Sequence, residues 1–223
     1  MKDYYSKNLN AGNLEKCYQI APPRIKQYMK AEMDYVLDHI QPNDTVIDLG
    51  CGYGRTLPAI AEKAGFVIGI DNSLHNLQMA KNRLKNYSNI FLAIMDAELL
   101  GLPDQSMDTV VCIQNGISAF KVEPIVLIRE TIRLTKPDGK ILFSTYSEKI
   151  WEERLDWFVK QSNAGLLGEI DWDLTGDGTI VCKDGFRATT FTSKQMLDFV
   201  TGAGHQGTIV EVDSSSMFVV ISP

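Results

Sequence analysis

The clearest pattern near the start of the chain is a run of apolar residues at helical spacing. It begins directly after Pro22 and Pro23, and apolar side chains then recur every three or four residues as far as Ile40. Proline is favoured in the first turn of a helix, so this pattern predicts an amphipathic helix over residues 22–40. The turn-forming residues 41–44 end it.

Beyond this turn, short apolar runs alternate with helical patterns. Continuous apolar runs are typical of strands buried on both faces of a sheet. Between these runs, apolar residues recur at helical spacing. They do so after Ser73, which can cap a helix, and over residues 125–132. The alternation predicts an α/β fold with a Rossmann-like, doubly wound, mostly parallel sheet in an α/β/α sandwich. The five expected strands are residues 45–49, 66–70, 90–95, 109–113 and 140–145, the last after a turn at residues 137–139.

The C-terminal third departs from this alternation. A helical pattern from Trp151 is followed by two strand-like runs within residues 176–191, which flank Lys183-Asp184-Gly185 as in a hairpin. After a helical pattern at residues 193–200, two strands are expected at residues 208–212 and 217–221. Their connection is too short for a parallel crossover, so an antiparallel C-terminal strand should close the sheet.

No repeat or flexible linker divides the chain, so we expect a single domain over residues 1–223. Within it, residues 1 to about 40 are expected to form an N-terminal helical lid. Residues 147–191, which interrupt the alternation before the last helix, are expected to form an insertion on the substrate side.

Composition limits the classes of function. The formal net charge of -6 would repel phosphate backbones, so nucleic acid is not expected as a partner. The four cysteines are widely spaced, with no CxxC pair and no grouping with histidine, which predicts reduced thiols, no metal site and a cytoplasmic protein. Residues 1–13 are polar and no stretch has the length needed to cross a bilayer, so no membrane association is expected.

The chemically informative segment is residues 46–55, Val-Ile-Asp-Leu-Gly-Cys-Gly-Tyr-Gly-Arg, where an expected strand ends in alternate glycines. Glycine lets a ligand approach the backbone, and a following helix offers free amide groups. A dinucleotide fingerprint would need glycine where Arg55 stands, which disfavours an oxidoreductase. Asp71 closes the second strand, where a doubly wound fold presents a carboxylate to ribose. The glycines alone could make a tight turn, but Asp71 together with Asp96 at the next strand end favours binding of an adenosine-containing ligand.

From about residue 45 to residue 146 the sequence resembles the class I S-adenosylmethionine-dependent methyltransferases. Residues 48–54 match the family's acidic-x-GxGxG motif. Residues 102–108 resemble its stretch before the fourth strand, which begins with Leu-Pro and ends with Phe-Asp, with Met107 in place of Phe. Residues 133–140 resemble its Pro-Gly-Gly turn into the fifth strand, with Asp138 in place of the first Gly. The resemblance implies S-adenosylmethionine as cofactor and S-adenosylhomocysteine as product. By this resemblance, the methionine portion of the cofactor contacts Gln114 and the loop of Gly50, Cys51, Gly52 and Gly54. Asp71 and Asn72 bind the ribose and adenosine. Asp96 and Ala97 bind the adenine edge.

Asp48, Asn115 and Tyr146 each have both a functional and a structural interpretation. Asp48 either contacts the ligand or holds the glycine loop by accepting backbone hydrogen bonds. Asn115 lies beside the transferred methyl group or caps a loop, and Tyr146 has the same standing, so these two are the catalytic candidates. Tyr5, Tyr18, Asn115 and Tyr146 are the candidate substrate residues.

The expected activity is transfer of a methyl group to a small-molecule acceptor by in-line displacement, which depends mainly on alignment. No His or Glu stands out as a general base. The alternative is a catalytically silent S-adenosylmethionine-binding protein that acts as a sensor or partner, and either would be a monomer or homodimer. The acidic loop at residues 171–177, with Trp151 and Trp172, favours a cationic or amine acceptor.

Overall fold

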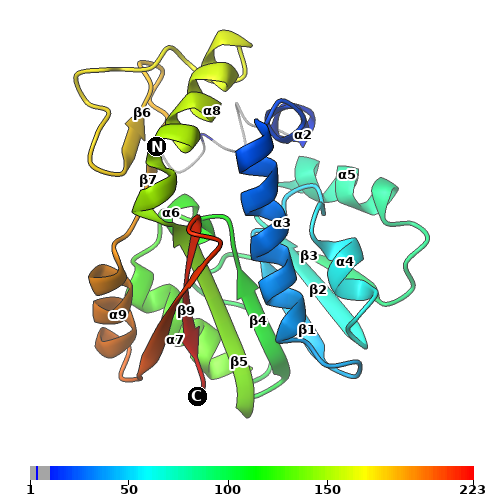
Figure 1. The fold of residues 1–223 in the computed structure, drawn as a ribbon. Coiled ribbons are helices and arrows are strands. Elements are labelled where there is room, and N and C mark those ends of the chain that lie inside the picture. Colours follow the sequence, from blue (N-terminus) through cyan, green and yellow to red (C-terminus); the bar gives the residue numbers. More distant parts are fainter. Residues whose placement is uncertain (1–3, 5–10) are drawn as a thin grey trace.

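The computed structural model describes Tyr4 and residues 11–223, and it contains a seven-stranded sheet with helices on both faces (Figure 1). The strand order is β3-β2-β1-β4-β5-β9-β8. All neighbouring strands pair in parallel except β9, which is antiparallel to both β5 and β8. The strands are β1 (Thr45–Leu49), β2 (Phe66–Asp71), β3 (Ile90–Ile94), β4 (Met107–Cys112), β5 (Thr135–Tyr146), β8 (Gly207–Val212) and β9 (Ser216–Ile221). The predicted α/β/α fold and the closing antiparallel strand are confirmed.

The helices begin where the local sequence favours it. Pro22 and Pro23 start α3, the Ser73 side chain accepts a hydrogen bond from the amide of Asn76 at the start of α5, and Thr192 forms a capping box with Gln195 at α9. The helices are α2 (Ala11–Gln19), α3 (Pro23–Asp38), α4 (Leu57–Ala61), α5 (Leu74–Arg83), α6 (Gly116–Ala119), α7 (Pro124–Leu134), α8 (Trp151–Asn163) and α9 (Ser193–Gly202), with a 3-10 turn at Glu148–Ile150. No helix of the described residues is long and apolar enough to span a membrane.

Each face of the sheet has its own hydrophobic core. On β1, Val46 belongs to the core that includes residues of α3, α4 and α5, whereas Ile47 belongs to the core formed with α7 and α9. Successive side chains of a strand point to opposite faces, so a continuous apolar run fills both cores. The chain passes from β1 to β2 on one side and later returns to β4 on the other. This reversal opens a crevice at the carboxyl ends of β1 and β4.

A third cluster lies above these strand ends. It joins α2 and the first half of α3 to α8 and to a two-stranded antiparallel sheet, β6 (Thr179–Val181) and β7 (Arg187–Thr189). We call α2, α8 and β6–β7 the cap (Figure 1). The Trp157 indole donates to the carbonyl of Cys17 at 2.9 Å, and the rings of Phe158 and Phe186 lie 5.7 Å apart. These contacts hold the parts of the cap together.

One expected boundary is wrong. The turn at residues 137–139 does not precede β5 but lies inside it, because β5 begins at Thr135. Met107 pairs with Thr135 and Thr109 pairs with Lys140, so the extra residues form a bulge. A Cβ on Gly139 would lie 2.7 Å from the carbonyl oxygen of Asp108, so this position favours glycine.

Candidate functional site

The glycine-rich loop after β1 has the backbone conformation that its sequence predicts. Gly50, Gly52 and Gly54 have φ angles of 78°, 55° and 79°, which disfavour side chains. The amides of Gly50 and Cys51 both donate to the carbonyl of Ile70, at 2.8 and 2.9 Å. The loop is therefore fixed to the end of β2.

Asp71, at that end of β2, is a hydrogen-bond centre. Its carboxylate accepts from the amides of Gly52 (3.0 Å) and Ser73 (2.8 Å) and from the side-chain nitrogen of Asn76 (3.2 Å). Burial nevertheless raises the pKa of Asp71 above its usual value. Asn76 is 5% exposed, and its Oδ1 is buried without a hydrogen-bond partner in the described part of the chain.

Asp48 is almost fully buried in β1, with 3% of its surface exposed. It accepts a 2.6 Å hydrogen bond from the Thr56 hydroxyl rather than from the backbone of the glycine loop. Burial raises the pKa of Asp48 to about 6, against the opposing effect of that hydrogen bond. The carboxyl group is thus able to change charge near neutral pH.

Two consecutive residues after β4 have left-handed backbones, Gln114 with φ 55° and Asn115 with φ 61°. The amide of Gln114 donates to the Ser144 hydroxyl at 2.9 Å, and its Oε1 accepts from the Tyr18 hydroxyl at 2.8 Å. Its Nε2 is buried and has no partner among the described residues. Such strained conformations for non-glycine residues are found mainly where the surrounding structure and function require them.

The side chain of Asn115 connects two elements and is 6% exposed. Its Oδ1 accepts from the Thr145 hydroxyl and its Nδ2 donates to the carbonyl of Thr189, both at 2.9 Å. Asn115 therefore links β5 to β7 of the cap while lining the same cavity as Gln114.

Glu32 is a buried carboxyl group that the sequence reasoning missed. It is fully buried on α3, and its Oε1 accepts hydrogen bonds from the hydroxyls of Ser144 (2.5 Å) and Ser216 (3.0 Å). Burial raises its pKa. The signal was present, because position 32 lies on the same helix face as Ile25, Met29 and Val36.

Of these groups, Asp48, Asp71, Gln114 and Asn115 line one cavity of about 210 Å³ at the carboxyl ends of the strands, and Glu32 does not. Ten of the residues singled out in the sequence line it: Tyr18, Asp48, Gly50, Cys51, Gly52, Asp71, Asn72, Gln114, Asn115 and Tyr146. The strand ends of β1, β2 and β4 therefore meet at a common space, as their positions in a doubly wound sheet require.

Three predicted site residues do not line the cavity, and the structure does not describe a fourth. Gly54 faces α5, where a Cβ would lie 2.8 Å from Leu84 Cδ1, and it does not line the cavity. Asp96 is exposed and accepts from the amide of Glu98 at 3.1 Å, while Ala97 is buried in the core of α7 and α9. Neither lines the cavity, so their contact with adenine stays a prediction. Tyr5 lies outside the described residues.

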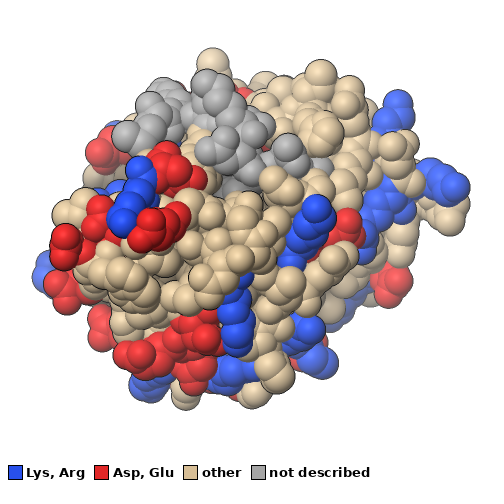
Figure 2. Space-filling model, turned by 90° about the horizontal axis from the view of Figure 1, so that it is seen from above, with Lys and Arg blue, Asp and Glu red and all other residues tan. Residues whose placement is uncertain are grey.

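The cap closes the other end of the cavity with aromatic side chains, Tyr18 from α2, Trp157 and Phe158 from α8, and Phe186 from the segment before β7. Figure 2 shows the molecule from this side, and among the described residues the acidic and basic side chains are interspersed rather than gathered into one basic patch.

The cavity offers neither a metal site nor a reactive thiol. Within Tyr4 and residues 11–223, no group of three or more His, Cys, Asp or Glu side chains is arranged to hold a metal. Burial raises the pKa of Cys17 to about 12 and that of Cys51 well above its usual value, so both thiols remain protonated at neutral pH.

Comparison with known proteins agrees with this geometry. Residues 46–139 match the family described as a methyltransferase domain. The fold superposes on the crystal structure of a SAM-dependent methyltransferase from Aquifex aeolicus with a TM-score of 0.63 and 16% identity, over 93% of this chain and 96% of that one. Residues 46–139 are therefore similar to the methyltransferase domain of S-adenosylmethionine-dependent methyltransferases. The family match contains the glycine-rich loop, Asp71 and Gln114.

Two curated relatives of this methyltransferase domain are similar over a shorter stretch. A 2-methyl-6-phytyl-1,4-hydroquinone methyltransferase from Synechocystis is 28% identical over 57% of this chain and 42% of its own length. A ubiquinone biosynthesis O-methyltransferase from Coxiella burnetii is 30% identical over 60% of this chain and 54% of its own. The chain thus spans about half the length of these relatives.

Proposed function

We propose that this chain binds S-adenosylmethionine at the strand ends and transfers its methyl group to a small-molecule acceptor. The observation that carries the proposal is that three residues lining one cavity each have a buried amide atom with no hydrogen-bond partner among the described residues: Asn76 Oδ1, Gln114 Nε2 and Gln161 Nε2. Buried polar atoms in native proteins are nearly always hydrogen-bonded, so a cavity that collects three without partners is suited to a polar ligand.

The residues at the β1–β2 end fit the cofactor. The left-handed glycines leave the loop backbone open, and Asp71 is a carboxylate already oriented by three hydrogen bonds, which suits ribose hydroxyls. Asn76 Oδ1 adds a free acceptor beside it. Asp48 and Gln114 supply a titratable carboxyl group and a free donor for the charged methionine end.

The chain contributes alignment rather than acid–base chemistry. When bound, the cofactor supplies a methyl group already activated on a sulfonium. Burial raises the pKa of Tyr18, and the described cavity lining contains no His or Glu, so that lining offers no evident strong base to the acceptor. The hydrogen bonds of Gln114 and Asn115 hold the end of β4 rigid, and the aromatic cap excludes water. Orientation of this kind can contribute roughly 7 to 11 kcal/mol in favourable cases.

The two curated relatives are named for reactions on a hydroquinone and in ubiquinone biosynthesis, which supports a small organic molecule as acceptor. The family match ends at residue 139, before the cap segment that begins at α8. The identity of the acceptor therefore depends on the cap, which lies outside the family match.

The test has two stages. Calorimetry with S-adenosylmethionine and S-adenosylhomocysteine should show one site per chain, and labelled methyl transfer should then be measured with phenols, carboxylic acids, thiols and amines. Failure to bind either compound would overturn the proposal. Binding without transfer to any acceptor class would favour the silent sensor instead.

A further inference from the structure

We propose that Gln161 is the residue that recognises the methyl acceptor, and that the acceptor is an oxygenated aromatic ring without positive charge. This inference rests on the proposed function, because it assumes that the β1–β2 end of the cavity holds the cofactor. It assigns the opposite end, beneath α8, to the acceptor.

The walls at that end suit a planar ring. Trp157 lies 6.0 Å from Tyr18 and 5.6 Å from Phe158, measured between ring centroids, and Phe158 lies 5.7 Å from Phe186. The Tyr146 side chain, at the end of β5, lines the same space. Aromatic side chains pack best against other rings in offset or edge-to-face arrangements at such distances.

Gln161 provides an unused hydrogen-bond donor among these rings. It lies on α8, one turn after Trp157, lines the cavity and is 3% exposed. Its Nε2 is buried and makes no hydrogen bond to any described residue. Two donors near these rings are already used, since the Trp157 indole donates to the carbonyl of Cys17 and the Tyr18 hydroxyl donates to Gln114 Oε1. A ligand oxygen is the partner that Nε2 lacks.

The charges around the cavity argue against an ammonium group at this end. The carboxylates in the described lining are Asp48 and Asp71, and both belong to the β1 and β2 ends. The acidic loop at residues 171–177 does not line the cavity, and Trp172 in that loop is 62% exposed. The amine acceptor was expected because of the carboxylates of this loop, and those carboxylates do not line the cavity. A buried ammonium without such a partner would be costly.

The test uses the intact chain saturated with S-adenosylhomocysteine, and calorimetry of ring compounds added to this complex. The oxygenated probes are catechol, hydroquinone and 4-hydroxyacetophenone, and phenethylamine is the matched cationic ring. Gln161→Leu removes the donor and keeps an apolar side chain of similar size. Gln161→Glu keeps the shape and replaces the donor by a carboxylate. Gln41→Leu, in the exposed turn before β1, is the control.

At least one oxygenated probe should bind the unmodified complex, and bind it more tightly than phenethylamine does. Its dissociation constant should rise roughly tenfold in both Gln161 variants and stay within twofold in Gln41→Leu. Affinity for S-adenosylhomocysteine should stay within twofold in all three variants, which separates this inference from the cofactor site.

Three results would overturn the inference: no oxygenated probe binds the complex, phenethylamine binds best, or Gln161→Leu leaves the affinity unchanged. If the unmodified protein does not bind S-adenosylhomocysteine at all, the proposed function is overturned instead.

Discussion

At the scale of single residues, Asp48 should couple cofactor binding to pH. Burial raises its pKa to about 6, so its carboxyl group is mostly neutral at pH 5 and ionised at pH 7.5. An ammonium group at the methionine end of a bound ligand stabilises the ionised form, which means that affinity should rise as pH rises through this range.

If binding lowers the pKa of Asp48 by about one unit, the affinity for S-adenosylhomocysteine is expected to be roughly fivefold higher at pH 7.5 than at pH 5. Asp48→Asn keeps the size of the side chain and an acceptor for Thr56, so it should flatten this pH profile. Calorimetry at a series of pH values measures the affinity of the unmodified protein and of the variant. An unchanged slope in the variant would show that another group titrates.

Asp71 has a different role in the proposed complex, because its carboxylate orders the loop around it and would also accept from the ribose hydroxyls. Asp71→Asn places an amide nitrogen where Gly52 N, Ser73 N or Asn76 Nδ2 now donates. We expect S-adenosylhomocysteine binding to weaken by roughly 10- to 150-fold, or about 1.5 to 3 kcal/mol. Asp34→Asn, on the exposed part of α3, is the matched control and should stay within twofold. Equal dissociation constants for Asp71→Asn and the unmodified protein would refute the ribose assignment.

The sequence predicted the residues of the β1 and β2 ends because glycine and aspartate there have few other structural uses. Gln114 and Asn115 were also predicted, but from their place after the fourth strand and from the family resemblance, since no glycine marks their left-handed backbones. The hydrogen bonds that favour this conformation come from Ser144, Thr145 and Thr189, which are distant in the sequence. Gln161 could not be distinguished from any other helical glutamine until the cap was placed.

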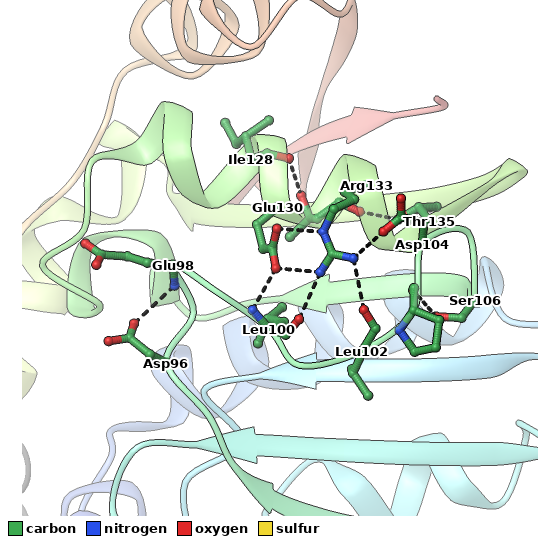
Figure 3. Close-up of polar contacts among 12 residues, drawn as sticks. Asp96, Glu98, Leu100, Leu102, Asp104, Ser106, Ile128, Glu130, Arg133 and Thr135 are labelled. Atoms are coloured by element: carbon green, nitrogen blue, oxygen red, sulfur yellow. Dashed lines mark hydrogen bonds and ion pairs between the residues drawn. The ribbon is translucent and has the colours of Figure 1, made fainter.

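At the scale of elements, the connection from β3 to β4 depends on one arginine. Arg133 on α7 donates to the carbonyls of Leu100 and Leu102, both at 2.9 Å, and to the carboxylate of Glu130 at 2.6 Å (Figure 3). Glu130 in turn accepts from the amide of Leu100 at 2.6 Å. The network fixes the second half of the connection, while Asp96 lies at its other end in Figure 3.

Arg133→Ala should lower the free energy of unfolding by roughly 2 to 3 kcal/mol, because it leaves the nearly buried Glu130 without its counter-ion and two carbonyls without a donor. Urea unfolding measures this change. Lys30→Ala is the control, since Lys30 pairs with Asp34 on an exposed helix face, and it should cost less than about 0.5 kcal/mol. Similar losses in both variants would mean that the network contributes no more than a surface ion pair.

Element positions were predictable to the extent that they depend on local pattern. The strand at residues 45–49 is confirmed at both ends, because an apolar run there is bounded by a turn and a glycine. The predicted start of β5 was wrong. Residues 137–139 have turn propensity, but pairing with β4 holds them as a bulge inside the strand. Tertiary pairing, which the local pattern does not contain, decided that boundary.

At the scale of the whole molecule, the protein is a sheet with two cores and a cap with a third. The sheet follows from the alternation of strands and helices. The cap does not, because its parts lie at opposite ends of the chain and meet through contacts such as Trp157 with Cys17. These contacts bring α2 over the cavity, where Leu14, Cys17 and Tyr18 line it.

A ligand in this cavity touches both the sheet and the cap, so binding should slow the opening of α2. Amide hydrogen exchange over residues 15–19 is expected to slow by at least tenfold at saturating S-adenosylhomocysteine, together with exchange in the glycine-rich loop. The ligand should also raise the free energy of unfolding by about 2.7 kcal/mol at a concentration 100 times its dissociation constant. Exchange in α2 reports local opening, whereas global stabilisation would also slow the most protected amides of the sheet.

The comparison that separates the two effects uses β8, an edge strand that does not line the cavity. If the ligand acts on α2 directly, protection there should increase more than in β8. Equal increases in both would mean that only global unfolding is suppressed. Protection of the glycine-rich loop without any change in α2 would mean that the cap opens independently of the cofactor, and that its closure depends on the methyl acceptor.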